Sequence, residues 1–222
     1  MEAIAILVGV LLVGFIVYFW YGSTEKTGPA DSVELIPGSQ PGNVQLVKSI
    51  KMPLSFNQPE GITYTYTGWI LVKDFTDGYG IERRVMSKSD SPGIYLNSTS
   101  NALMVKIDTF GSKESVLIPN IPAMKWLHFA LVVDQRAVDI YINGILRQHH
   151  TLSQLPKQNE EPVVFGPGWG GVIGKVGYTA KSLAPDEIKK LSREEPPSDL
   201  QPKPSKGSYF DISWYTGRLN SV

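Results

Sequence analysis

Apolar and polar residues alternate with a period of two through most of the middle of this 222-residue chain. That period places successive side chains on opposite faces of an extended strand, so it predicts β-strands. Short turn sequences such as Asp77-Gly78 and Asn143-Gly144 separate the runs. Asn-Gly is the dipeptide that a two-residue hairpin turn prefers, because both positions need a positive φ. The clearest runs are residues 62–72, 103–107, 116–118, 126–133 and 138–142.

The run 126–133 is largely apolar on both faces, which is typical of a central strand that is covered on two sides. His128 belongs to this run, and we therefore expect it in or near the core rather than in a site. One convincing helix, residues 184–191, has Pro185 and acidic residues in its first turn. This pattern predicts an all-β fold, a two-sheet antiparallel jelly-roll sandwich.

The N-terminal segment has a different pattern, because residues 3–21 carry no charge and are almost entirely apolar. About 19 residues at a rise of about 1.5 Å each cross a hydrocarbon layer of about 30 Å. The run ends in four aromatic residues, Tyr18 to Tyr21, which suit the lipid–water interface. A cleaved signal peptide is the alternative, but no Lys or Arg precedes the run and no small-residue cleavage site follows it. We therefore predict one transmembrane helix, within residues 1–22, ahead of the sandwich.

Composition divides the rest of the chain into four parts. From the N-terminus we expect a Gly/Pro/Ser-rich spacer (23–43), the β-sandwich (44–193), a Pro-rich linker (194–207) and an aromatic C-terminal arm (208–222). In the arm, Phe210, Ile212 and Trp214 alternate with more polar neighbours, as in a strand. Such a strand pairs either with an edge of its own sheet or with another chain.

Four segments of the strand region agree in order and spacing with a known family. They are Thr67–Val72, Arg84–Lys88 with Gly93–Leu96, Trp126–Asp134 with Val138–Gly144, and Gly174–Tyr178 with Ser182–Ile188. Together they resemble the concanavalin A-like lectin/glucanase superfamily, in its laminin-G-like jelly-roll branch. The resemblance implies the fold and says much less about function, since sugar binding, protein binding, catalysis and scaffolding all occur on this sandwich.

Charge and composition narrow the classes of function. Lys plus Arg equals Asp plus Glu, 21 of each, and no basic cluster is present, so we expect no nucleic-acid partner. The absence of cysteine excludes disulfides, thiolate metal sites and cysteine nucleophiles. Glucanases of the superfamily place two or three acidic residues on one strand, and this chain has no such run. We therefore predict that the protein is not an enzyme.

Residues 166–171 read GPGWGG, a formal match to the dinucleotide-binding pattern G-x-G-x-x-G. That pattern needs a helix to begin within it, whereas the residues that follow, 172–178, are branched and interrupted by glycines. We therefore expect a strand there and no nucleotide. The stretch is interpreted as a loop at the rim of the sandwich with Trp169 at its tip. An exposed Trp169 would be a candidate contact residue, and a buried one would be only part of a turn.

Other candidate contact residues are aromatic. Tyr64, Tyr66, Tyr79 and Tyr95 are candidates for stacking on a sugar, with packing in a core or interface as the alternative. In the C-terminal arm, the candidates are Phe210, Ile212 and Trp214.

Metal binding and glycosylation have weaker signals. Relatives in the superfamily often hold Ca²⁺ through rim-loop aspartates, which makes Asp74, Asp77 and Asp90 weak calcium candidates, but aspartate also simply favours turns. Asn97 begins an Asn-Ser-Thr sequon, which matters only if the domain is lumenal or extracellular. We expect no other cofactor.

These expectations combine into one function and one alternative. The sequence predicts a non-enzymatic, single-pass membrane protein whose β-sandwich binds a protein or glycan partner and tethers it to a bilayer. The alternative is a structural component of a large assembly. Membrane-tethered jelly rolls with terminal arms resemble minor capsid proteins of large DNA viruses, which link a shell to an inner membrane.

Overall fold

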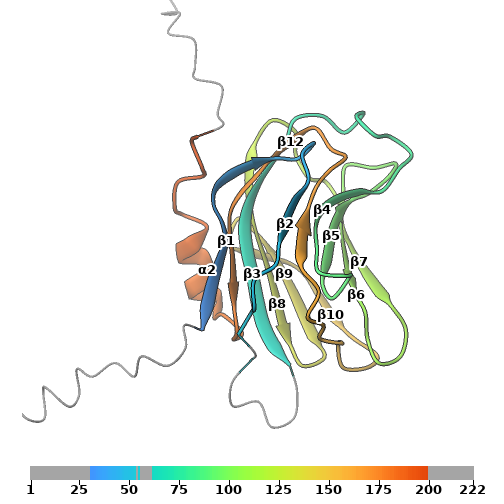
Figure 1. The fold of residues 1–222 in the computed structure, drawn as a ribbon, viewed down its shortest axis with the longest axis vertical. Coiled ribbons are helices and arrows are strands. Elements are labelled where there is room, and N and C mark those ends of the chain that lie inside the picture. The colour runs from blue at the N-terminus through green and yellow to red at the C-terminus, as the bar shows by residue number, and fades with distance from the viewer. Residues whose placement is uncertain (1–30, 54, 56–61, 200–222) are drawn as a thin grey trace, which may run out of the picture.

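Twelve strands in the described part of the chain form two antiparallel sheets of six, which stack face to face (Figure 1). The computed structural model describes residues 31–53, 55 and 62–199. Sheet A has the order β1 (Ser32–Pro41), β12 (Gly171–Thr179), β3 (Thr63–Val72), β8 (Trp126–Asp134), β9 (Ala137–Ile142) and β10 (Ile145–Thr151). Sheet B has the order β2 (Leu46–Lys48), β11 (Val163–Phe165), β4 (Arg83–Ser87), β5 (Gly93–Leu96), β6 (Leu103–Ile107) and β7 (Glu114–Ile118). The predicted two-sheet antiparallel sandwich is confirmed.

The hydrophobic core lies between the two sheets, because each strand turns every second side chain inward. Strand β8 contributes Leu127, Phe129 and Leu131 to this core, and β9 contributes Val138 and Ile140. The hairpin between β8 and β9 and the next one, between β9 and β10, keep sheet A continuous. In the second hairpin Asn143 and Gly144 have φ values of 51° and 75°, as the predicted turn requires.

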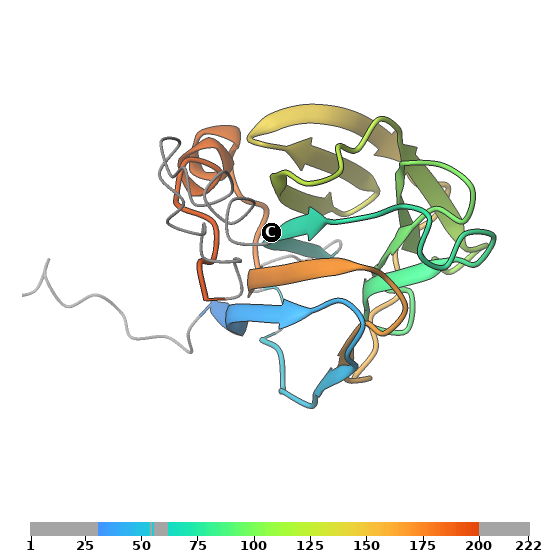
Figure 2. The ribbon, with the colours of Figure 1, turned by 90° about the horizontal axis from the view of Figure 1, so that it is seen from above.

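The outer face of sheet A is covered by helix α2 (Pro185–Leu191), as Figure 2 shows. Ile188 of this helix and Leu183 pack against Ala130 and Val132 of β8, which explains why β8 is apolar on both faces. The Glu187 carboxylate accepts a hydrogen bond of 2.8 Å from the Ala184 amide and so caps the first turn. The predicted helix is confirmed.

The predicted spacer is wrong over much of its length, because residues 32–41 form strand β1 at the edge of sheet A. β1 pairs with β12 from Ser32 opposite Thr179 to Pro41 opposite Val172. Its Pro and Gly residues made the segment look like a linker. An edge strand accepts proline because one side of its backbone has no partner strand, and the register shifts in β1 mark these irregularities. The sandwich therefore begins at Ser32 and not at residue 44.

The first part of the predicted Pro-rich linker also belongs to the domain. Residues 194–199, here called the strap, cross the outer face of sheet A from α2 towards β1. Lys175 Nζ donates a hydrogen bond of 2.7 Å to the Glu195 carbonyl oxygen. At the end of the strap, the Asp199 carboxylate accepts bonds from the Ser39 amide (2.9 Å) and hydroxyl (2.8 Å). The strap therefore holds the chain against the β1–β12 edge up to residue 199.

His128 lies on the outer face of sheet A, where it is buried and packs edge-on against Trp69 with ring centroids 5.2 Å apart. The expectation that it is a core or near-core residue is confirmed. Burial lowers the pKa of His128 to about 4. The folded chain therefore keeps this imidazole neutral well below pH 6.5.

We expect the folding stability of His128→Phe to fall less in mild acid than that of the wild type. Between pH 6.5 and about 4, the unfolded chain binds a proton at His128 that the folded chain does not, so folding stability falls as the pH falls. The loss between pH 7 and pH 4.5 amounts to about 2–3 kcal/mol. Urea unfolding of the wild type and the variant at both pH values measures it. Equal pH dependence in the two proteins would contradict the assignment.

The predicted transmembrane helix within residues 3–21 and the C-terminal arm, residues 208–222, lie outside the described residues. Within the described part, no helix is both long enough and apolar enough to cross a membrane. The membrane anchor and the arm therefore stay predictions.

Candidate functional site

A hollow lies between the sheets, at the end of the sandwich where β3 begins and β12 ends. Its volume is about 770 Å³, which is in the range of sites that bind small ligands. We call it the tyrosine cavity. It is lined by Tyr64, Tyr66 and Tyr178, by residues 49–53, and by Lys88, Ser91, Gln158, Asn159, Glu160 and Pro162.

The three tyrosines come together through strand period and register. Tyr64 and Tyr66 are two residues apart on β3, so both point inward, and Tyr178 of β12 pairs directly with Tyr66. The rings of Tyr66 and Tyr178 meet edge to face with centroids 5.1 Å apart, and Tyr64 and Tyr66 do so at 5.6 Å. The result is a rigid aromatic wall.

The hydroxyl groups of these tyrosines differ in what they contact. Tyr178 donates to the Pro53 carbonyl oxygen at 2.9 Å, and Tyr66 donates to the Met52 sulfur at 3.6 Å. The Tyr64 hydroxyl is buried and has no hydrogen-bond partner among the described residues. Burial raises the pKa of all three phenols, that of Tyr178 to about 12, so each hydroxyl stays a neutral donor at physiological pH. The Tyr64 hydroxyl is therefore a buried donor whose hydrogen-bonding capacity is unused among the described residues.

The opposite wall of the cavity is polar. Lys88 is buried and donates from Nζ to the Asn159 side-chain oxygen at 3.0 Å and to the Asn159 carbonyl oxygen. Asn159 returns a bond of 2.9 Å from Nδ2 to the Lys88 carbonyl oxygen. Burial lowers the pKa of Lys88. Nearby, the Ser91 hydroxyl donates to the Lys157 carbonyl oxygen. These bonds fix the polar groups in place before any ligand arrives.

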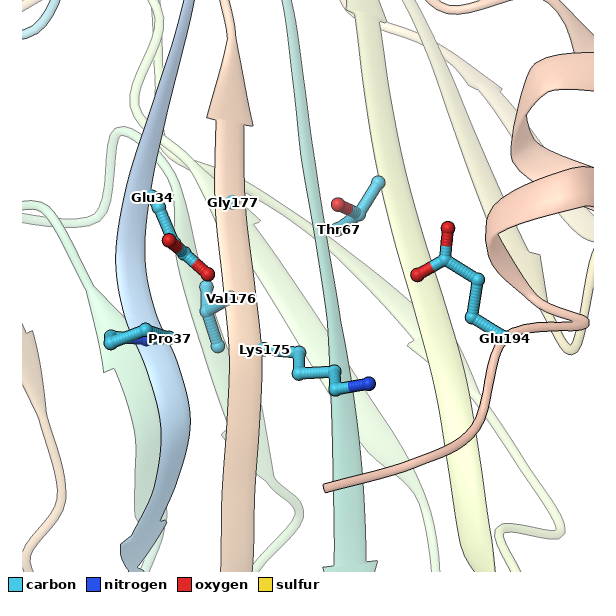
Figure 3. A pocket seen from close by; sticks show the side chains of 7 residues that line it. All are labelled: Glu34, Pro37, Thr67, Lys175, Val176, Gly177 and Glu194. Carbon is cyan, nitrogen blue, oxygen red and sulfur yellow. The ribbon is translucent and has the colours of Figure 1, made fainter. Parts of the chain in front are cut away.

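A second, smaller hollow of about 290 Å³ lies on the outer face of sheet A (Figure 3). Glu34 of β1 and Glu194 of the strap flank it, with Thr67 of β3 between them (Figure 3). Lys175 adopts a positive φ of 44°, and its ammonium already binds the strap at Glu195. We interpret this hollow as the space beneath the strap, and not as a ligand site.

Trp169 is fully buried, with 0% of its surface exposed, so it is not an exposed contact residue of the loop GPGWGG. Its ring belongs to the core and lies against Gly42 and Gly171, where any Cβ would collide with it. β12 begins at Gly171, so a strand and not a helix follows the loop, as expected. Within this stretch, Gly171 makes room for the indole ring.

The three calcium candidates do not come together. The Asp74 carboxylate accepts bonds from the Thr76 hydroxyl (2.6 Å) and amide (2.8 Å), and these bonds lower the pKa of Asp74. Asp77 lies in the same loop, residues 73–82. Asp90 lies at the other end of the sandwich, where it forms an ion pair of 2.7 Å with Lys113. Within the ranges that the structure describes, no group of three His, Asp or Glu residues is placed to hold a metal ion.

The other predicted site residues occupy separate settings. Tyr79 is 65% exposed in the loop 73–82. Tyr95 is half-buried on the outer face of sheet B, with Lys106 Nζ 4.8 Å from its ring centre and its hydroxyl bound to Asp90. The Asn97 side-chain oxygen accepts a bond of 3.1 Å from the Thr99 amide, and its glycosylation stays a prediction. Phe210, Ile212 and Trp214 lie outside the described residues.

A comparison of the sequence with models of protein families identifies the family of this chain. The family model of the concanavalin A-like lectin/glucanases superfamily matches residues 48–189. This chain belongs to that superfamily. The match covers most of the sandwich, and β1 and the strap lie outside it.

Solved structures of similar fold include binding domains of toxins. The binding domain of Paraclostridial Mosquitocidal Protein 1 is 18% identical with a TM-score of 0.53, and the match covers 72% of this chain and 46% of that one. A structure on the entry of botulinum neurotoxin type C into cells through two ganglioside molecules is 16% identical (TM-score 0.53, 72% and 45% covered). The binding domain of botulinum neurotoxin DC in complex with rat synaptotagmin II is 14% identical (TM-score 0.54, 72% and 46% covered).

At these identities the likeness shows the fold alone, and this superfamily member matches less than half the length of those binding domains. A comparison with curated proteins gives no significant match.

Proposed function

We propose that this chain is a non-enzymatic, membrane-anchored binding module that takes a glycan in the tyrosine cavity and tethers it to a bilayer. The observation that carries the proposal is the buried Tyr64 hydroxyl, which has no partner among the described residues and lines a cavity of about 770 Å³. Leaving a buried hydroxyl unsatisfied costs about 1–3 kcal/mol, so a ligand that accepts its hydrogen bond gains that free energy back.

The chemistry of the cavity favours a ligand rich in hydroxyl groups. Its polar wall combines the amides of Asn159 and Gln158 with the Ser91 hydroxyl, which both donate and accept hydrogen bonds, as sugar hydroxyls do. The charged residues that line the cavity, Lys51, Lys88 and Glu160, leave a net charge of only +1. A neutral or weakly charged sugar therefore fits better than a strongly anionic group.

Two further arguments support the wider proposal. Residues 3–21 have the length and composition of a membrane-spanning helix. The structurally similar proteins are binding domains, and the structures of two of them concern gangliosides and synaptotagmin II. Fold likeness supports a binding role for this chain, with a glycan or a protein as partner, but it does not choose the partner.

A glycan array probed with the full chain in detergent tests the proposal. We expect Tyr64→Phe, which removes only the hydroxyl, to weaken binding up to about tenfold. Gln158→Trp, at an exposed position of the cavity wall, should block binding altogether without affecting folding. Tyr141→Phe is the matched control, because Tyr141 lies under α2 on the outer face of sheet A. No binding by the wild type on a broad array would refute the proposal, and equal binding by all variants would place the site elsewhere.

A structural role is the second candidate, and one observation favours it. The described chain enters the sandwich at Ser32, at one end of β1, and the strap leaves sheet A at Ser39, near the other end of β1. A domain anchored at its N-terminus would therefore present the C-terminal arm away from the bilayer, as a link between a shell and a membrane requires. If this role is correct, deleting residues 208–222 abolishes assembly and leaves the domain folded.

A further inference from the structure

The entry point of the chain lies beside the tyrosine cavity. Ser32, the first residue of β1, pairs with Thr179, and Val33 pairs with Tyr178, which lines the cavity. The Ala180 amide also donates a bond of 2.7 Å to the Asp31 carbonyl oxygen, so the chain is fixed to this end from residue 31 onward. In Figure 1, the blue strand β1 begins at this end of the sandwich.

The distance from this end of the sandwich to the predicted membrane segment is limited by chain length. Residues 22–31 connect the two, and ten residues span at most about 35 Å when fully extended. For comparison, a random coil of ten residues has a root-mean-square end-to-end length of about 17 Å. Strand β3, with its ten residues, is itself about 33 Å long. The cavity end is therefore the end that lies near the bilayer, and the loop 73–82 lies at the far end.

Two large apolar side chains are exposed at the cavity end of the sandwich. Ile50 on the cavity wall is 40% exposed, and Phe110, in a loop at the same end, is 70% exposed. That loop is placed by bonds from the Asp108 amide to the Asp90 carbonyl oxygen (2.8 Å) and from the Phe110 amide to the Leu155 carbonyl oxygen (3.0 Å). Lys51 beside Ile50 is also exposed. Exposed apolar side chains next to lysine suit the boundary between lipid and water.

From this arrangement we infer that the tyrosine cavity opens towards the bilayer that anchors the chain and takes the sugar headgroup of a glycolipid in that same bilayer. The inference rests on the proposed function and names the source of its glycan. A headgroup held in the same membrane is present at an effective concentration in the millimolar range. A weak site with few polar contacts is therefore sufficient for a headgroup in the same bilayer, whereas a soluble glycan would need a tighter one.

The orientation is tested first, and the absence of cysteine from the chain makes the experiment simple. The full chain is reconstituted in lipid nanodiscs with one cysteine, from either Phe110→Cys or Tyr79→Cys, labelled with an environment-sensitive dye. Both positions are exposed, but they lie at opposite ends of the sandwich. We expect quencher-labelled lipids to quench the dye at position 110 at least about fivefold more than the dye at position 79. Equal quenching, or stronger quenching at position 79, would overturn the inference.

The ligand is tested in the same nanodiscs, using a panel of neutral and sialylated glycosphingolipids, with phosphatidylserine as a lipid without sugar. The readout is amide hydrogen exchange in residues 49–53 and 88–91, which line the cavity. We expect a glycosphingolipid in the same disc to slow exchange about tenfold in the wild type and in Tyr141→Phe, and much less in Tyr64→Phe. Phosphatidylserine should have no effect.

The outcomes separate the inference from the proposed function. Protection by a soluble glycan, or by a glycolipid in separate vesicles, as strong as that in the same disc would overturn the inference and leave the proposed function standing. Protection by phosphatidylserine equal to that by the glycolipids would overturn sugar recognition. No protection by any glycolipid, together with binding on the glycan array, would overturn the inference alone, and failure of both experiments would end both proposals.

Discussion

Arg83→Met is expected to lower the melting temperature of the domain by about 10 °C. Arg83 is only 2% exposed, and its guanidinium donates hydrogen bonds to three main-chain carbonyl oxygens. Two of them, on Phe75 and Asp77, accept bonds of 2.8 Å from Nη1, and the third, on Asn97, accepts from Nη2. Methionine keeps the apolar stem but leaves these three carbonyl oxygens without their guanidinium donor. We estimate a loss of at least about 3 kcal/mol, and each kcal/mol corresponds to about 2–4 °C in a domain of this size.

The neighbouring residue supplies the control for this prediction. Arg84 follows on the same strand, but its side chain lies on the outer face of sheet B and is half-buried. Arg84→Met should therefore shift the melting temperature by no more than about 2 °C. Differential scanning calorimetry of the two variants decides the point. Equal shifts would mean that Arg83 does not hold the loop 73–82 against residue 97.

Gly171→Ala is expected to destabilise the fold by several kcal/mol, about 3 or more, or to prevent soluble expression. A Cβ at this position would lie far inside van der Waals contact with the Leu71 carbonyl oxygen and with the Trp169 ring. The carbonyl belongs to the paired strand β3, and the indole fills the core, so neither can move cheaply. Chemical unfolding of the purified variant measures the loss.

Gly177→Ala, in the same strand, is the matched control. The nearest atoms to its added Cβ would be the Thr67 hydroxyl at 3.7 Å and the Val33 carbonyl oxygen at 3.9 Å, which are ordinary contact distances. This variant should be within about 0.5 kcal/mol of the wild type. If Gly171→Ala proved equally mild, Gly171 would not be needed to accommodate the Trp169 ring.

The central part of the fold can be predicted from the sequence, because the local pattern of apolar residues there agrees with the position of the strand in the folded domain. The run 126–133 is apolar on both faces, and β8 indeed lies between the core and helix α2. Strand β1 was missed for the opposite reason. The segment contains Pro37, Gly38 and Pro41, and such residues are typical of linkers. It forms a strand only because it pairs with β12, which is distant in the sequence. The strap was missed in the same way.

The sequence predicts less of the candidate site than of the fold. Alternation on β3 indicates that Tyr64 and Tyr66 share one face, but it does not indicate which partners they meet. Lys88, Asn159 and Tyr178 reach the cavity through the register between strands and the stacking of the sheets, which no local pattern encodes. The fate of Trp169 likewise depended on Gly42, which is far from it in the sequence.

The strap and β1 together determine how the domain would respond to a pulling force. Tension between the N-terminal segment and the C-terminal arm enters along β1 and leaves through the contact of Asp199 with Ser39 on the same strand. Such a force is carried by the β1 backbone between Ser32 and Ser39 and by the hydrogen bonds from Ser39 to Asp199. The rest of sheet A, sheet B and the tyrosine cavity lie outside this path. The domain can therefore couple two attachment points mechanically while its binding cavity stays unstrained.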